Sequence, residues 1–230
     1  TETTQLLNDL YPIRRALVAD GNIETLRLIE KFSKITLDYS KFPSGTEVGN
    51  WTVPKSWNLR SFQLKDRNKN LLQDLSDSNL RVMVGSLSFK GIVSYAELTR
   101  HCYIKEDMQD AIPYVTNYYG KRDWAICMKA SEFNKLKKHE NYHVDIDVEE
   151  SPSDLVVGSK LVGNSAIKRE VLFSTYNCHP QMANHELSGP LALMVIYDYL
   201  KKTGPHYYSY RFLICPENIG SAAFLHKNKR

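Results

Sequence analysis

The chain has 230 residues, of which 42% are hydrophobic and 24% charged, and its formal net charge is +4. These values are typical of a folded protein with one large domain or two small ones. No apolar run approaches the ~18 residues of a membrane-spanning helix, so no membrane association is expected. The basic residues are scattered, and the single dense run at 135–139 is interpreted as a solvated loop rather than a nucleic-acid site.

Signals for export and for a structural zinc motif are missing from the sequence. Residues 1–15 lack the basic and apolar regions of a signal peptide. The four cysteines are far apart and form no C-x-x-C pair, which excludes a zinc ribbon. Three of them lie in or beside apolar runs, as buried free thiols do. This pattern predicts a reducing, cytoplasmic location.

Two amphipathic helices are predicted first, over residues 3–17 and 22–36, with Asn22 as the N-cap of the second. Pro and Gly residues in 41–58 then predict an ordered turn and a short edge strand. Residues 50–130 have a β-rich texture, interrupted by a capping box at "SYAE", 94–97, that predicts a short helix. Aromatic, strand-like runs are expected over 111–130.

Beyond residue 140 the pattern changes to alternating strands and helices. Strands are predicted over 142–149, 154–163, 169–178 and 208–217, and helices over 189–202 and 218–228. The helix at 189–202 is apolar nearly all round and carries Pro190 in its first turn, which predicts a buried helix. This order is typical of an α/β fold with a largely parallel sheet.

Polar side chains follow two of these strands. His179 follows the strand at 169–178 and precedes a loop with His185 and Glu186, and Glu217 ends the strand at 208–217. In open α/β sheets, sites form at the carboxyl ends of strands. A catalytic zinc needs about three His, Asp or Glu ligands and an open position, and a further carboxylate can serve as general base.

Spacing alone leaves simpler interpretations open for each of these residues. A lone histidine at a strand end, such as His179, is more often a hydrogen-bonded structural residue, and Glu217 is equally explained as a cap of the helix that follows it. Glu186 is most simply interpreted as a solvated loop residue. No G-x-S-x-G or G-x-x-x-x-G-K pattern is present, so neither a serine hydrolase nor a phosphate loop is expected.

Five sequence blocks that cover nearly the whole chain form a recognisable series: "LYPIRRALVADGNIETL", "PSGTEVGNWTVPKSWN", "AIPYVTNYYGKRDWAIC", "CHPQMANHELSGP" and "YRFLICPENIGS". In content and order they resemble a bacterial aminopeptidase-like family related to the zinc-dependent aminopeptidases. In that family a β-rich domain is inserted into an α/β/α peptidase core.

The resemblance implies a metal site in which one ligand is changed. His179 corresponds to the first metal-ligand histidine. His185 stands in "ANHELSG" where the family turn, A-N-D-N-L-S-G, has an aspartate that bridges two ions in related di-zinc enzymes. Glu217 lies where relatives place a Glu pair that holds the general base and a ligand, and Asn218 replaces the second Glu. Because neutral histidine cannot bridge two ions, at most one zinc is expected, held by His179 and His185, with Glu217 as the catalytic base.

The resemblance also implies a three-layer α/β/α zinc-aminopeptidase-like core with an inserted β-rich domain. The expected division is 1–49 for N-terminal helices of the core, 50–135 for the insertion and 136–230 for the rest of the core, which is incomplete because family members are longer and carry further ligands. The expected function is zinc-dependent hydrolysis of an N-terminal peptide bond or the amide of a metabolite. The alternative is an impaired relative that serves as a binding or scaffold module; nucleic-acid binding rests on charge alone and is not expected.

Overall fold

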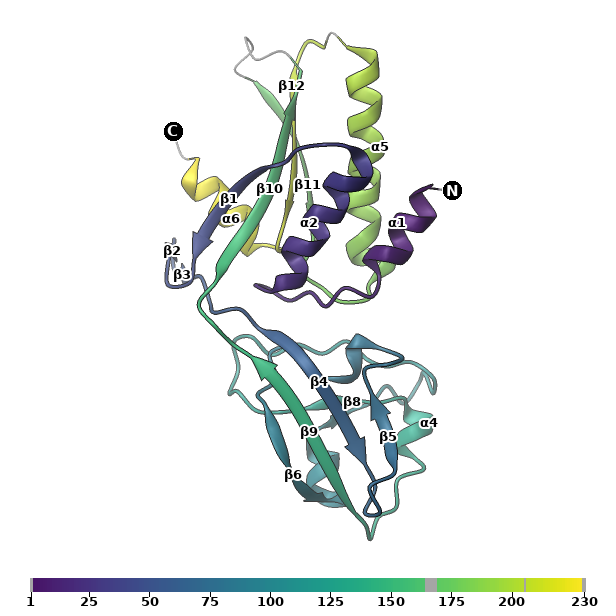
Figure 1. Cartoon of the computed structure of the whole chain (residues 1–230). Coiled ribbons are helices and arrows are strands. Elements are labelled where there is room, and N and C mark those ends of the chain that lie inside the picture. Colours follow the sequence, from purple (N-terminus) through teal and green to yellow (C-terminus); the bar gives the residue numbers. More distant parts are fainter. Residues whose placement is uncertain (1, 164–168, 205, 229–230) are drawn as a thin grey trace. The chain divides into compact units, whose positions relative to one another are not determined.

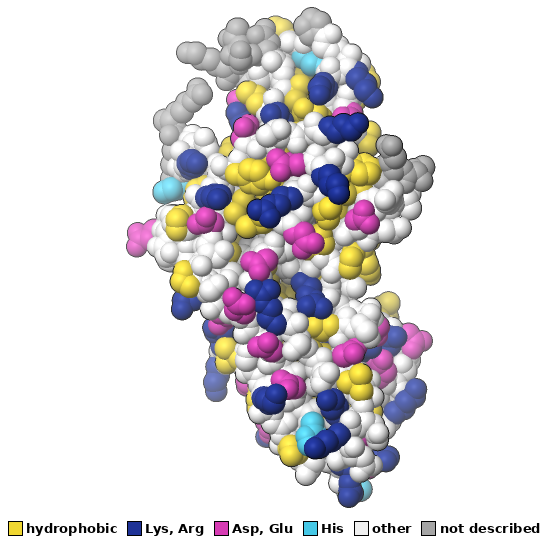
Figure 2. Space-filling model, in the orientation of Figure 1, with side chains coloured by type: hydrophobic (Ala, Val, Ile, Leu, Met, Phe, Trp, Pro, Cys, Tyr) yellow, Lys and Arg dark blue, Asp and Glu magenta, His cyan; other side chains and the backbone are white. Residues whose placement is uncertain are grey.

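A computed structural model describes residues 2–163, 169–204 and 206–228, and these form two compact units. Unit 1 contains the residues up to Ser56 together with those from Glu150 onward, and unit 2 is Trp57–Glu149. Within the described residues, no helix has both the length and the apolar composition needed to cross a lipid bilayer. Basic and acidic side chains are interspersed over the face of the molecule drawn in Figure 2.

Unit 1 is built on a four-stranded sheet in the order β1-β10-β12-β11 (Figure 1). Its main elements are α1 (Glu2–Leu10), α2 (Asp20–Ser33), β1 (Asp38–Pro43), β10 (Asp154–Val162), β11 (Glu170–Tyr176), α5 (Ser188–Thr203), β12 (Ser209–Cys215) and α6 (Ile219–Lys227), with a small hairpin of β2 (Glu47–Val48) and β3 (Trp51–Thr52).

The sheet is mixed, so the expectation of a largely parallel sheet is wrong. β1 pairs with β10 and β10 with β12 in antiparallel fashion, and only β11 and β12 run parallel. The sequence could not reveal this, because a strand buried on both faces is apolar throughout whichever way its neighbours run. The parallel pair is the one joined by a helix, α5, as parallel pairs require.

Two apolar clusters cover the two faces of this sheet, which makes unit 1 a three-layer structure. Side chains alternate across β12: Phe212 and Ile214 pack with α1, α2 and α5, while Leu213 and Cys215 pack with α6 and the β2–β3 hairpin. β10 alternates in the same way through Val156 on the helical side. The expected α/β architecture is therefore present in unit 1, with helices on both faces.

The first helices differ from their predicted bounds. α1 ends at Leu10, well before residue 17, and α2 begins at Asp20 with Ala19 as N-cap. Asn22 is therefore not a helix cap. It is buried inside α2, and its Nδ2 donates to the carbonyl of Ala16 at 2.7 Å, so that it holds the segment between the helices instead.

Unit 2 is built on a four-stranded sheet in the order β5-β4-β9-β6, antiparallel throughout, and also contains a two-stranded parallel pair of β7 and β8. Its elements are β4 (Asn58–Lys65), β5 (Leu71–Asp74), η1 (Asn79–Arg81), β6 (Phe89–Ser94), α3 (Tyr95–Arg100), β7 (Cys102–Tyr103), β8 (Ile126–Cys127), α4 (Ala130–Phe133) and β9 (Asn141–Glu149). The Ser94 hydroxyl caps α3 by accepting from the amide of Glu97, as the capping box predicts.

The bounds of unit 2 differ from the segment 50–135 expected to form an insertion. β9 pairs with β4 and β6, so it belongs to unit 2 and not to the segment 136–230 that we assigned to the core. A period of two identifies a strand but does not say which sheet it joins. Within 111–130, the only strand is β8; Trp124 there stacks on Phe89 with ring centroids 4.3 Å apart.

Arg15 lies in the segment between α1 and α2 and is only 1% exposed. Its Nη1 donates to the Leu10 carbonyl at 2.8 Å and to Thr25 Oγ1 at 3.3 Å, which ties the end of α1 to α2. Burial lowers the pKa of Arg15 to about 10, and nearby Glu186 opposes that shift. The guanidinium therefore stays charged at neutral pH inside the core of unit 1.

Gly189, in the first turn of α5, allows this helix to approach β11 closely. A Cβ at this position would overlap Thr175 Oγ1 and would lie 3.0 Å from Thr175 Cβ. Thr175 is itself buried, so it has little room to move. Helix α5 is thus held against β11 at a position where no side chain larger than hydrogen fits.

We expect Gly189→Ala to destabilise the protein by about 1–3 kcal/mol, because an added methyl in a packed contact forces α5 away from β11. Gly204→Ala, at the other end of α5, is the matched control: its Cβ would meet nothing closer than 3.8 Å. Urea denaturation measures both. Equal stability of the two variants would show that the α5–β11 contact is looser than described.

Replacing Arg15 with Met should cost about 3–5 kcal/mol, because it leaves the buried Glu186 without its positive neighbour. The adjacent Arg14 is exposed, so Arg14→Met should change the unfolding free energy by no more than about 0.5 kcal/mol. Thermal and urea unfolding of both variants provide the measurement. A stable Arg15→Met protein would contradict the electrostatic role of Arg15.

Candidate metal centre

The parallel pairing of β11 and β12 brings two polar chain segments together. The pairing ends with Tyr176 opposite Cys215, and the Asn177 amide then donates to the Cys215 carbonyl at 3.2 Å. His179 and Glu217 follow within three residues of these strand ends. Their side chains converge, with Nε2 of His179 3.5 Å from Oε2 of Glu217. The expected proximity of these two residues is thus present in the structure.

A wide helical turn, η2 (Ala183–Leu187), brings the third side chain. In this π-helical turn the amide of Leu187 bonds back five residues to the Met182 carbonyl. Such turns are rare and occur frequently at functional sites. The exposed ring of His185 lies 5.0 Å, centroid to centroid, from the ring of His179. His185 and Glu186 are adjacent in this turn, yet one faces solvent and the other is buried.

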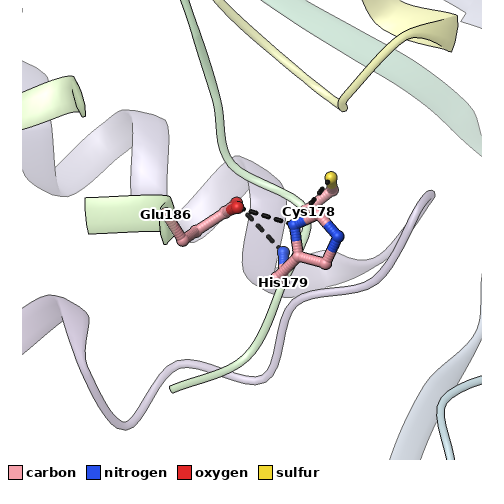
Figure 3. A group of neighbouring side chains, drawn as sticks. All are labelled: Cys178, His179 and Glu186. Carbon is pink, nitrogen blue, oxygen red and sulfur yellow. Dashed lines mark hydrogen bonds and ion pairs between the residues drawn. The ribbon is translucent and has the colours of Figure 1, made fainter. Parts of the chain in front are cut away.

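Glu186 is a functional candidate that the sequence did not reveal. We interpreted it as a solvated loop residue, and this is wrong, because its side chain is 0% exposed. Its two oxygens both bond to His179: Oε1 accepts from the backbone amide at 3.0 Å, and Oε2 lies 2.7 Å from Nδ1 (Figure 3). The imidazole is thus fixed on one side by Glu186 and faces Glu217 on the other.

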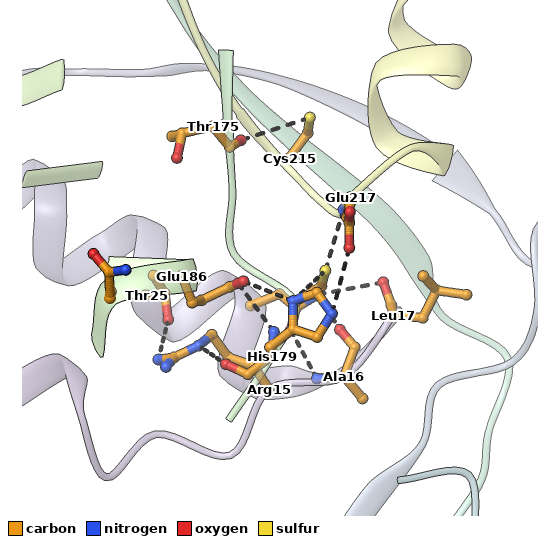
Figure 4. A network of polar contacts seen from close by, with 12 residues as sticks. Arg15, Ala16, Leu17, Thr25, Thr175, His179, Glu186, Cys215 and Glu217 are labelled. Carbon is orange, nitrogen blue, oxygen red and sulfur yellow. Dashed lines mark hydrogen bonds and ion pairs between the residues drawn. The ribbon is translucent and has the colours of Figure 1, made fainter. Parts of the chain in front are cut away.

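Arg15 completes the support of His179 from the other side of the turn. Its Nε donates to the His179 carbonyl at 2.8 Å, in the network drawn in Figure 4. Arg15 also interacts electrostatically with Glu186. The His179 residue is therefore held at its amide, its carbonyl and its ring. Neither Arg15 nor Glu186 carries a sequence signal for this role, since both contacts depend on the tertiary fold.

Cys178 lies beside the site, and its sulfur is already in contact with two neighbouring groups. Its sulfur accepts from the Glu217 amide at 3.1 Å and lies 3.5 Å from Nδ1 of His179. Burial, and then Glu186, raise the pKa of the Cys178 thiol well above its usual value. Glu186 contacts the backbone amide and Nδ1 of His179, and the Cys178 sulfur accepts from the Glu217 amide, so Cys178, His179 and Glu186 form a hydrogen-bonded group that a metal ion would have to disrupt.

His179, His185 and Glu217 fit a metal ion better. One potential ligand atom from each lies within 4.8 Å of the others. Two ligands at about 2.1 Å from a tetrahedral zinc are roughly 3.4 Å apart, and the 3.5 Å between His179 and Glu217 agrees with this value. The other ligand-atom separations are within 4.8 Å, and His185 is exposed on the solvent side of the group.

The backbone next to Glu217 is strained. Asn218 has φ 57° and ψ −61°, and the amide of Ile219 bonds to the Glu217 carbonyl at 2.6 Å, which describes a γ-turn. Such strain costs about 1–3 kcal/mol and occurs at functional sites. Glu217 does not cap α6 with its side chain, since Asn218 occupies the N-cap position without a side-chain bond.

Known proteins resemble this chain in sequence and in fold. A Clostridium acetobutylicum protein whose name proposes a role in polysaccharide biosynthesis, with an aminopeptidase-like domain, is 33% identical over 228 residues, which are 99% of this chain and 51% of the relative. A crystal structure from the same organism, whose name proposes a peptidase, has a TM-score of 0.92 at 33% identity and is covered to 53%. The chain therefore spans about half the length of these relatives.

A zinc aminopeptidase from Bacillus subtilis shares the fold alone, with a TM-score of 0.59 at 13% identity; the match covers 97% of this chain and 63% of that one. The resemblance to aminopeptidase-like proteins seen in the sequence is thereby confirmed. A family model described as a domain of unknown function, DUF4910, matches residues 4–230. The chain belongs to this DUF4910 family.

Proposed function

We propose that this chain is part of a zinc-dependent hydrolase of the aminopeptidase type, acting on an N-terminal peptide bond or a related amide. One observation carries the proposal: two histidines and a carboxylate converge within 4.8 Å at the ends of two adjacent parallel strands. The relatives' names and the shared fold support the same class. In this proposal, unit 1 belongs to an α/β/α peptidase core, and unit 2 is an insertion in it.

The proposed roles follow from the surroundings of each side chain. His179, held by Glu186, presents Nε2 to the site, and His185 can turn its exposed ring toward the same point. Bound zinc would polarise the substrate carbonyl and lower the pKa of a water. Glu217, one-third exposed and 3.5 Å from His179, would take the proton of that water as general base. Further ligands would come from the longer protein.

The name of the Clostridium relative bears on the substrate. It supports an amide on a sugar or other metabolite as well as a peptide. The three proposed residues do not distinguish a peptide from an amide on a sugar or metabolite, because they would act on the amide group that both substrates share. We therefore propose the amide, rather than a peptide chain, as the recognised chemistry.

The second candidate is a binding or scaffold module without competent metal chemistry. The observation that favours it is His185, which offers a single lone pair from a neutral ring. Two dications about 3.5–4 Å apart need negative charge between them. If Glu217 binds metal it can no longer act as a free base, so this chain lacks either a third ligand or a base. Weak or absent hydrolysis by the chain itself follows.

Purified without added metal, the chain should bind at most one zinc, and hydrolysis of aminoacyl nitroanilides should be weak or absent. His185→Asp should raise zinc affinity, because a carboxylate adds negative charge and a second oxygen to the site. His206→Asp is a matched control, since His206 bonds to the Leu200 carbonyl away from the site. Elemental analysis and calorimetry measure both. Two zincs per wild-type chain, or zinc-restored hydrolysis, would favour a complete di-zinc enzyme instead.

Glu217→Gln separates the two roles open to this carboxylate. As a base, Glu217 is not bound to zinc, so we expect zinc affinity to stay within about threefold while any hydrolysis falls by about 10²–10⁴-fold. Calorimetry and a nitroanilide assay, run on the chain and on a full-length relative with the equivalent change, give the two readouts. A loss of affinity of tenfold or more would make Glu217 a ligand and leave the chain without a base.

A further inference from the structure

The carboxylate of Glu186 has both oxygens directed at one residue, and both partners on that residue are nitrogens. The backbone amide of His179 is an obligatory donor, 3.0 Å from Oε1. Nδ1 of the same residue lies 2.7 Å from Oε2. Figure 3 draws both contacts, from the Glu186 carboxylate to the backbone amide and to the ring of His179. No solvent reaches the carboxylate, which is 0% exposed.

This arrangement determines which ring nitrogen carries hydrogen. A carboxylate accepts and does not donate, so a short contact to Oε2 requires a proton on Nδ1. Arg15 supplies the opposite charge that a buried carboxylate needs, through the electrostatic interaction between the two groups. With its proton on Nδ1, the neutral ring keeps its lone pair on Nε2, the atom that faces Glu217 at 3.5 Å.

We propose that Glu186 is the positioning residue of the metal centre: it fixes the tautomer and the orientation of His179 so that Nε2 is offered to a divalent transition-metal ion. This inference rests on the proposed function, in which His179 is a ligand. A histidine that binds metal commonly donates its other ring N–H to a carboxylate, which orients the ring and strengthens the ligand. Glu186 itself would not touch metal or substrate.

A purely structural role would be to close the turn that follows β11. The structural role and the positioning role can be distinguished by a substitution that keeps the shape of the side chain but removes its charge. Glutamine at 186 keeps the size of the side chain but offers one acceptor and one donor. It can serve either the amide or Nδ1 of His179, while its own NH₂ faces the other donor. Closure of the turn would survive with one bond, whereas the tautomer of the ring would no longer be fixed.

The test compares wild type with Glu186→Gln by nitrogen and proton NMR of the histidine rings and by zinc titration. His179→Gln assigns the His179 signals. We expect the hydrogen-bonded Nδ1–H signal of metal-free wild type to be lost or displaced in Glu186→Gln, and zinc affinity to fall about 10–100-fold. Glu170→Gln, a carboxylate change on β11 where Glu170 pairs with Arg211, should leave both unchanged.

Each outcome separates this inference from the proposed function. A folded Glu186→Gln with the wild-type Nδ1–H signal and zinc affinity would overturn the inference while zinc binding stands. If wild type binds no zinc, the proposed function and the metal-orienting role fall together, and the NMR comparison reports only what the carboxylate does to the ring. Should Glu186→Gln not fold, Glu186→Asp keeps the charge but shortens the reach, and an unchanged Nδ1–H signal there would equally overturn the inference.

Discussion

The parallel pairing of β11 with β12 is the constraint on which the candidate site depends. Parallel strands end at the same edge, so His179 and Glu217 meet although 38 positions separate them in the sequence. α5 makes this pairing possible, because a parallel return needs a crossover. Gly189 then allows α5 to pack on β11, and the turn η2 at the start of that helix delivers His185 and Glu186. The strand pairing, the α5 crossover and the turn η2 together position the residues of the candidate site.

Electrostatic interactions and hydrogen bonds hold His179 in place within this site. Two opposite charges, Arg15 and Glu186, are almost fully buried in unit 1. Removal of two charges from water costs several kcal/mol per ion, and a hydrophobic pair of similar volume is often as stable. Stability alone therefore gives a weak reason for the pair. Both charged groups contact His179: Arg15 donates to its carbonyl, and Glu186 contacts its amide and its ring. A support of this kind restricts the ring to a single orientation.

The sequence predicted the parts of the fold whose signals are local. Strands β10, β11 and β12 and helices α5 and α6 lie within a few residues of their expected places, because apolar runs bounded by turn residues are read from the chain directly. Strand direction and the sheet that β9 joins could not be predicted, because they are set by contacts between distant residues. Asn22 shows the same limit: its local pattern fits a helix cap, but tertiary contacts bury it.

For the candidate site, the sequence indicated His179, His185 and Glu217 as residues of the right chemical type near strand ends, and family resemblance singled them out. Glu186 and Arg15 have no such signal: a glutamate in a polar loop is ordinarily solvated, and an arginine before a helix is ordinarily exposed. Their burial follows from the π-helical turn, which no residue pattern announces. The residues that face a ligand can be recognised from type and position, whereas those that orient them are defined by the fold.

The negative charge of turn η2 is that of Glu186, and its position affects how many metal ions the site could hold. A carboxylate that binds metal directly can be shared by two ions. A carboxylate that accepts a hydrogen bond from a metal-binding histidine strengthens that histidine as a ligand but contacts no ion. In this chain the turn carries His185 at its exposed position and Glu186 at its buried one. The negative charge of the turn is therefore on a residue that supports His179 and not on a candidate ligand. In the proposed metal centre, such an arrangement favours a single ion over a pair, and it leaves the activation of water to Glu217.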